Sequence, residues 1–185
     1  LTRNPVVEIS SESPDDWNKG TIFIGTEAVL HRIPTADTVV FADIDRDLGA
    51  PRMTGAQEVL SMIAKAARMV GAKGSLVIQT RQVESPLIVA LSQTDVSTAL
   101  QKWSDADTAQ RHAMMLPPFG AIARVLVMAP RSLTEITLPA GVHTARDEDA
   151  VLLRAPSRTE LDSAISIIRS EFGTAVRIHI DPYRF

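Results

Sequence analysis

Four short apolar runs in the first eighty residues constrain the fold of this chain most. They cover residues 6–9, 21–24, 38–42 and 75–80, and most lack the polar–apolar alternation of a half-buried strand. Between the third and fourth runs a helix is predicted over 54–70, with a capping box at Thr54 and Gln57 and a C-terminal cap at Gly71. This helix carries so few charges that we expect it to be buried on most sides. Apolar strands joined by helices are typical of a largely parallel sheet covered on both faces.

The second part of the chain has a different pattern. Helices predicted over 84–101 and 104–115 lead to Pro117-Pro118, a candidate domain boundary because consecutive prolines stop a helix. Strands predicted over 121–128, 135–138, 150–154 and 174–180 then accompany an amphipathic helix over 157–172, capped by Ser157 and Glu160. The chain is therefore predicted to be α/β, with a mainly parallel sheet over 1–115 and a small α+β domain over 116–185.

The composition excludes several kinds of site. The 185 residues include no cysteine, which removes disulfides, thiolate nucleophiles and cysteine-based zinc or iron–sulfur sites. No uncharged apolar run approaches the roughly 20 residues of a membrane span, and no signal peptide is recognisable, so we expect a cytoplasmic protein. The first residue is Leu1 rather than Met, which predicts a fragment of a longer chain.

Charge is distributed unevenly along the chain. The formal net charge is −3; up to Met115 there are 11 basic and 14 acidic residues, and from Leu116 onward there are 8 of each. This mild acidity argues against a protein whose main task is to bind phosphates. A local basic face stays compatible with it if acidic residues segregate, as Asp147-Glu148-Asp149 do in a predicted loop.

Three carboxylates, those of Asp43, Asp45 and Asp47, alternate at the end of the third predicted strand. If the strand continued through them, they would share one face and could hold Mg²⁺. The alternative is a solvated loop in which Arg46 neutralises part of the charge.

Other motifs give little support for a catalytic centre. Gly71 to Gly74 follow their helix, whereas a phosphate-binding loop precedes one, so a helix cap and turn is the better interpretation. No Walker A motif and no G-x-S-x-G elbow occurs, and the four histidines lack metal-ligand spacing. Gly25-Thr26 places a glycine and a hydroxyl at the carboxyl edge of a predicted strand, where α/β sheets bind ligands.

An ordered set of motifs suggests a family. The chain contains Ile24-Gly25-Thr26-Glu27, His31-Arg32-Ile33, Asp43-Ile44-Asp45, a helix over 62–69, and then Gly71, Gly74 and Val77-Ile78-Gln79-Thr80. This set resembles the second motor lobe of the primosomal protein N-prime (PriA) family of replication-restart helicases. In that family the corresponding motifs are Ile-Gly-Thr-Gln, Lys-Gly-His, Asp-x-Asp and a helix with Gln-Val-Ala-Gly-Arg-Ala-Gly-Arg. Further segments up to Ile180-Asp181-Pro182 extend the resemblance over nearly the whole chain. It implies half or more of a RecA-like lobe over 1–115 and a C-terminal domain over 116–185.

The chain departs from this family where ATP is bound. The last arginine of the family's helix acts as a finger on the γ-phosphate, but the two arginine positions here are Ala66 and Met69. Methionine supplies neither charge nor a planar donor fork, and an arginine finger contributes on the order of 10³–10⁵ in rate. Arg68 lies one residue before Met69, the position of the family's last arginine, and is therefore rotated by about 100° around the helix. This rotation favours a structural ion pair for Arg68 over a contact with the γ-phosphate. In the other motifs Glu27 replaces glutamine and His31-Arg32 replaces the Lys-Gly pair.

The resemblance therefore implies a part of a replication-restart primosome protein that binds DNA forks and supports primosome assembly, with inactive helicase and ATPase motifs and no catalytic residue. The implied nucleotide-binding residues are Lys65 and Arg68, and the implied DNA-binding residues are Thr26, His31, Arg32, Arg154 and Arg158. The implied partners are forked or single-stranded DNA, primosome proteins and single-strand-binding proteins, with no membrane. The family uses ATP with Mg²⁺, and a zinc module upstream of the matching region; no cofactor is expected here.

The residues leave other interpretations open. The chain could belong to a working ATP-dependent 3′–5′ DNA helicase whose ATP contacts come from other residues. It could be a protein-interaction scaffold without DNA binding, or an unrelated small α/β enzyme that uses the acidic strand end. For Arg154 and Arg158, ordinary solvated arginines are an equal alternative.

Overall fold

The computed structural model of the chain describes residues 5–13, 21–50, 53–128, 133, 136–147 and 150–182. The chain divides into two compact units, one of residues 1–50 with 54–83 and the other of residues 51–53 with 84–185. Both contain helices and strands, so the predicted mixed α/β class is confirmed. The second unit begins with the helices that the sequence assigns to the first domain, whereas the prediction places the boundary at Pro117-Pro118.

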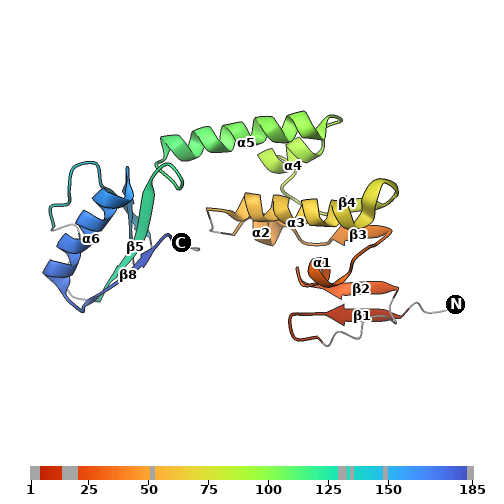
Figure 1. Cartoon of the computed structure of the whole chain (residues 1–185), viewed down its shortest axis with the longest axis horizontal. Helices are drawn as coiled ribbons and strands as arrows, with labels where there is room; N and C mark the ends of the chain where they lie inside the picture. The colour runs from red at the N-terminus through yellow and green to blue at the C-terminus, as the bar shows by residue number, and fades with distance from the viewer. Residues whose placement is uncertain are drawn as a thin grey trace. The chain divides into compact units, whose positions relative to one another are not determined.

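The first unit contains four short parallel strands. β1 (Val6–Ile9) pairs with β2 (Ile22–Gly25), and β3 (Thr38–Phe41) pairs with β4 (Ser75–Ile78) (Figure 1). The parallel direction predicted from the apolar runs is confirmed for both pairs. The described strands form two separate two-stranded sheets, so the continuous parallel sheet of a RecA-like lobe stays a prediction.

A single long helix, α3 (Gly55–Val70), packs against β3 and β4. Its buried side chains recur at helical spacing and include those of Val59, Ile63, Ala66 and Met69. The opposite side, including Ser61 and Arg68, is exposed. Only Gln57, Ser61, Ala67 and Arg68 of this helix are exposed and its other residues are buried or half-buried, in agreement with the expected burial on most sides.

The two ends of α3 differ in how well the sequence predicts them. The Thr54 side chain makes no cap hydrogen bond to the helix backbone, so the Thr54 half of the predicted capping box is absent; its hydroxyl donates to the Glu58 carboxylate instead. At the other end Gly71 has a φ of 62°, and its N–H donates to the Ala67 carbonyl. The predicted glycine cap is confirmed.

Shorter helices complete the first unit: α1 (Val29–Arg32), α2 (Asp45–Leu48) and the 3-10 turn η1 (Gly71–Lys73). Because α2 begins so soon after β3, Asp45 and Asp47 are helical and do not continue the strand. The alternation that would have put the three aspartates on one strand face is therefore absent.

One face of each parallel strand pair is not covered by the described residues. The side chains of Val6, Ile22, Ile24, Val40 and Val77 are 43–60% exposed. The register places Val6 beside Ile22 and Val40 beside Val77, so the exposed side chains of each pair share a face. The prediction that helices cover both faces is wrong for this part of the chain.

The second unit opens with two helices that pack against each other, α4 (Pro86–Leu91) and α5 (Val96–Ala113). The sequence places the break between helices near residue 102, whereas the structure places it at 92–95. The Asp95 carboxylate accepts a hydrogen bond from the Thr98 backbone N–H at 3.1 Å and so caps α5. In the described part of the chain no helix combines the length and apolar character needed to cross a membrane.

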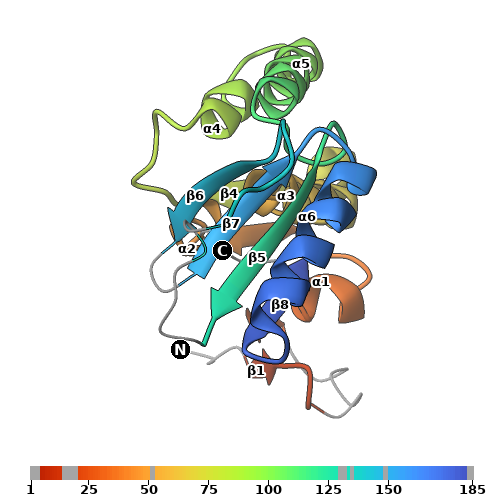
Figure 2. The same ribbon diagram turned by 90° about the vertical axis from the view of Figure 1, so that its left-hand side faces the viewer.

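A four-stranded antiparallel sheet with one covering helix completes the second unit. β5 (Ala121–Val127), β6 (His143–Asp147), β7 (Ala150–Ala155) and β8 (Val176–Ile180) lie in the order β6-β7-β5-β8. Figure 2 shows α6 (Arg158–Phe172) lying against one face, where its apolar stripe and inward-facing strand residues form the core. The sequence predicts a strand at 135–138; residue 135 lies outside the described residues, and residues 136–138 do not form a strand. The strand β6 is not predicted from the sequence.

Candidate nucleic-acid interface

The sheet of the second unit has one face turned away from α6. In β5 the side chains of Ala123 and Val125 belong to the core under α6, so Arg124 between them lies on the other face, because successive side chains of a strand alternate. The register places Arg124 beside His179 of β8. Arg177, two residues before His179, lies on this face as well.

The two remaining strands extend the same surface. Arg154 of β7 lies opposite Ile122 of β5 and opposite His143 of β6. We call the face that carries these side chains the basic face; its members are Arg124, Arg154, Arg177, His143 and His179. Arg177 and both histidines are exposed, whereas Arg124 and Arg154 are half-buried.

The described carboxylates of α6, and that of Asp181 after β8, lie away from the basic face. Glu160, Asp162 and Glu171 belong to α6, and Asp181 follows β8 and lies 3.7 Å from Arg158. A hydrogen bond from the Ser157 hydroxyl lowers the pKa of Glu160 and keeps it ionised at the N-terminus of α6. The acidic cluster predicted at 147–149 lies outside the described side chains. The register places Asp147 of β6, opposite Ala150, at a position on the same face as His143 and Arg154. The separation of charge therefore holds for the carboxylates of α6 and not for every position of the sheet.

Arg154 is held in place by the segment before the sheet. Its Nη1 donates to the Met114 carbonyl at 3.4 Å, and its Nε is buried without a hydrogen-bond partner among the described residues. Ile122, opposite Arg154, is fully buried. This end of the basic face is thus more enclosed than the end at Arg177.

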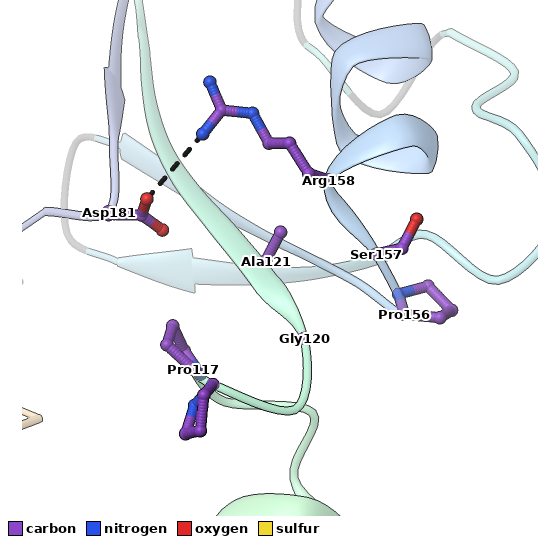
Figure 3. A pocket seen from close by; sticks show the side chains of 8 residues that line it. Pro117, Gly120, Ala121, Pro156, Ser157, Arg158 and Asp181 are labelled. Carbon is purple, nitrogen blue, oxygen red and sulfur yellow. Dashed lines mark ion pairs between the residues drawn. The ribbon is translucent and has the colours of Figure 1, made fainter.

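Arg158, the other arginine predicted to bind DNA, lies elsewhere. It begins α6, where its Nε lies 2.9 Å from the Asp162 carboxylate and its Nη1 lies 3.7 Å from that of Asp181. It lines a small open cavity of about 380 Å³ with Pro117, Pro156 and other residues, and Figure 3 shows its guanidinium directed at Asp181. The structure does not bring Arg158 together with Arg154 at one surface, and two carboxylates neutralise it.

In the first unit two candidate side chains, those of Lys65 and His31, meet around Glu27. The Lys65 Nζ lies 3.3 Å from the Glu27 carboxylate and 2.9 Å from the His31 Nε2, which lies 3.4 Å from the same carboxylate. A predicted nucleotide-binding residue and a predicted DNA-binding residue are therefore neighbours. The carboxylate between them offsets the positive charge that a phosphate would need.

The other candidates of the first unit contact backbone. Arg32 donates from Nη1 to the Ser13 carbonyl at 2.5 Å and from Nη2 to that of Ser11 at 3.1 Å, so it fixes the turn after β1. The described hydrogen bond of Arg68 runs from Nε to the Ala64 carbonyl of its own helix, at 3.2 Å, and replaces the expected ion pair. Thr26 is exposed at the end of β2.

The positions that correspond to the family's arginines face inward. Ala66 is fully buried, and Met69 is 9% exposed in a core with Ile9 and Ile33. Neither side chain reaches a surface at which a phosphate could bind.

Asp45 has a structural role at the carboxyl edge of β3 and β4. Its carboxylate accepts hydrogen bonds from the Thr80 hydroxyl and from the Arg81 backbone N–H, and these two bonds lower its pKa. Among the described residues no three histidine, aspartate or glutamate side chains gather as a metal site requires. Asp45 thus ties the start of α2, which follows β3, to the segment after β4.

Four members of the basic face were not predicted as site residues. The alternation of Arg177 and His179 with Val176, Ile178 and Ile180 was a usable signal, because it places both on the uncovered face of a half-buried strand. Arg124 gave a weaker signal as an interruption of an apolar run, and His143 gave none because β6 was not recognised.

Comparisons with known proteins add no family to this description. A scan against protein-family models gives no match, and a search of curated proteins gives none.

Proposed function

We propose that the chain is a DNA-binding part of a replication-restart primosome protein, with a degenerate RecA-like lobe that does not hydrolyse ATP. The observation that carries DNA binding is the basic face, on which three arginines and two histidines from four strands lie apart from the described carboxylates of α6. Restart function rests on the sequence resemblance alone.

The chemistry of the face suits phosphates. Arginine presents several N–H donors in a rigid fork and keeps its charge at any physiological pH, which is why it recurs at phosphate contacts. Such contacts supply most of the affinity for nucleic acids in general and position the protein without reading sequence. A chain of net charge −3 can therefore bind DNA locally while its remaining surface repels it.

The loss of ATP hydrolysis is supported by the first unit. Ala66 and Met69 lie in its core, and Lys65 lies beside Glu27. With no arginine to stabilise charge on the transferred phosphoryl group, the expected rate falls by several orders of magnitude.

The direct test uses the whole chain with fluorescent forked and single-stranded DNA. We expect binding to both that weakens steeply with salt, and no DNA-stimulated ATP hydrolysis. Absence of binding at low salt would overturn the proposal. ATP hydrolysis abolished by Arg68→Ala would instead support a working helicase.

One observation favours a second candidate, a protein-interaction scaffold. The uncovered apolar side chains of the first unit, such as Ile24 and Val40, are exposed to a degree that is unusual for parallel strands. A scaffold without nucleic-acid affinity predicts no binding of either DNA at any salt concentration, which distinguishes it from the proposed function.

A further inference from the structure

This inference rests on the proposed function and names the ligand of the basic face. We propose that Arg154, Arg124 and Arg177 form an arginine track that binds the phosphate backbone of one single-stranded nucleic acid, without reading its bases. The three residues come from β7, β5 and β8, which are neighbours in the sheet.

The register makes each arginine of the track a diagonal neighbour of the next. Arg154 lies opposite Ile122, two residues before Arg124; Arg177 lies opposite Leu126, two residues after Arg124. Diagonal neighbours on one face are separated by about 7–8 Å, within reach of long side chains. This spacing is close to that between successive phosphates along one strand, so the track can contact about three of them.

The direction of the track favours a single strand over a duplex. It crosses the sheet from β7, where His143 of the edge strand β6 lies beside Arg154, to the edge strand β8, where His179 lies beside Arg124. Leu152 and Leu126 lie on one side of this diagonal, and Ile122 and His179 lie on the other. One line of arginines with aliphatic side chains along one side matches one backbone with its bases turned to that side, whereas a duplex presents two backbones.

No described aromatic side chain of the second unit belongs to the strand positions that form this face. Trp103 belongs to α5, Phe172 to the core under α6, and the Phe119 ring packs edge-on against His112 at 5.2 Å. Stacking on such rings strengthens single-strand binding without selecting a base, and sequence is read by hydrogen bonds to base edges. We therefore expect contacts to phosphates and little preference for sequence.

The test uses the whole chain and its variants Arg177→Gln, Arg124→Gln and Arg154→Gln, with fluorescent oligothymidylate and a mixed-sequence strand of about 15 nucleotides. The matched control is Arg146→Gln, because Arg146 lies opposite Val151 on the α6 side of the same sheet and is also exposed. A duplex of the same length is the second probe. Circular dichroism melting checks that each variant folds.

We expect wild type to bind both single strands within about threefold of each other and the duplex more weakly. The slope of log affinity against log salt should be near −2, since about 0.7 counterion is released per phosphate contact on single strands, and each track substitution should reduce its magnitude by about 0.7. Arg146→Gln should leave the slope unchanged. Arg177 is exposed, so its variant keeps the test valid if Arg154→Gln fails to fold.

Other results separate the two proposals. If neither the single strands nor the duplex bind, the proposed function fails together with the arginine track. If DNA binds but Arg177→Gln and Arg146→Gln behave alike, or if the duplex binds more tightly than either strand, DNA binding survives and the arginine track is wrong.

Discussion

Asp45 accepts hydrogen bonds from the Thr80 hydroxyl and the Arg81 backbone N–H, and these hold the pKa of its carboxyl below the ordinary value. The bonds favour the ionised form in the folded chain. Since the folded pKa lies below the unfolded one, the stabilisation is fully present above the unfolded value and is lost as the pH falls through the folded value.

Asp45→Asn should therefore lower the melting temperature of the first unit at pH 7. The difference from wild type should shrink as the pH falls below about 4, where the unfolded carboxyl takes up its proton. Thermal melts of both proteins at pH 7 and near pH 3 measure this. The exposed neighbour Asp43, changed to Asn, is the control; equal effects of the two substitutions at both pH values would contradict the role given to Asp45.

Gly25 shows a packing reason for a motif that resembles a ligand-binding edge. It pairs with Ile9 in the β1–β2 register, and a Cβ at this position would overlap the Ile9 carbonyl oxygen and lie 2.9 Å from the Val29 side chain. The chain therefore requires glycine here whether or not a ligand binds.

Gly25→Ala should destabilise the first unit by on the order of 1–3 kcal/mol or more, because backbone atoms must move to admit the methyl group. Chemical denaturation of wild type and variant gives the difference. Thr26→Ala, at the adjacent exposed residue, should be nearly neutral. A stable Gly25→Ala protein would show that the approach of the two strands is looser than described.

Among the elements, α6 is the best predicted. Its apolar stripe, its Ser157 cap and its terminal Gly173 all follow from local sequence, and Ser157 does accept the Thr159 backbone N–H at 3.2 Å. Helix periodicity and capping depend on residues a few positions apart, so one sequence suffices to predict them.

Ser157→Ala should cost about 1 kcal/mol, since one N–H at the start of α6 loses its acceptor. Ser163→Ala, on the exposed part of the same helix, should have little effect because alanine favours helices. Denaturant unfolding of the two variants measures the difference, and equal stabilities would contradict capping by Ser157.

Elements that depend on distant partners were predicted less well. The polar strand β6 (His143–Asp147) has no apolar pattern, and pairing with β7 makes it a strand. The break before α5 was misplaced because Asp95 was not recognised as a cap. Parallel pairing of β1 with β2 and of β3 with β4 followed from their apolar runs, but how many strands join into one sheet did not.

At the scale of the whole molecule, the charge distribution depends on sheet order rather than on composition. A net charge of zero from residue 116 onward gives no indication that Arg124 and Arg177 share a face; that follows only from the antiparallel register of β5 and β8. Of the predicted DNA-binding residues, Arg154 lies on this face. Arg158 does not, because the start of α6 places it beside Asp162 and Asp181.

The central claim is that single-stranded DNA binds to the face of the sheet turned away from α6, and a nuclear magnetic resonance titration of the labelled whole chain tests it most directly. With unlabelled oligothymidylate as the probe, we predict that the largest amide shifts occur in β5, β7 and β8, around Arg124, Arg154 and Arg177, and that the exposed side of α6 is nearly unaffected. Shifts concentrated on α6 or around Glu27, His31 and Lys65 would contradict the account.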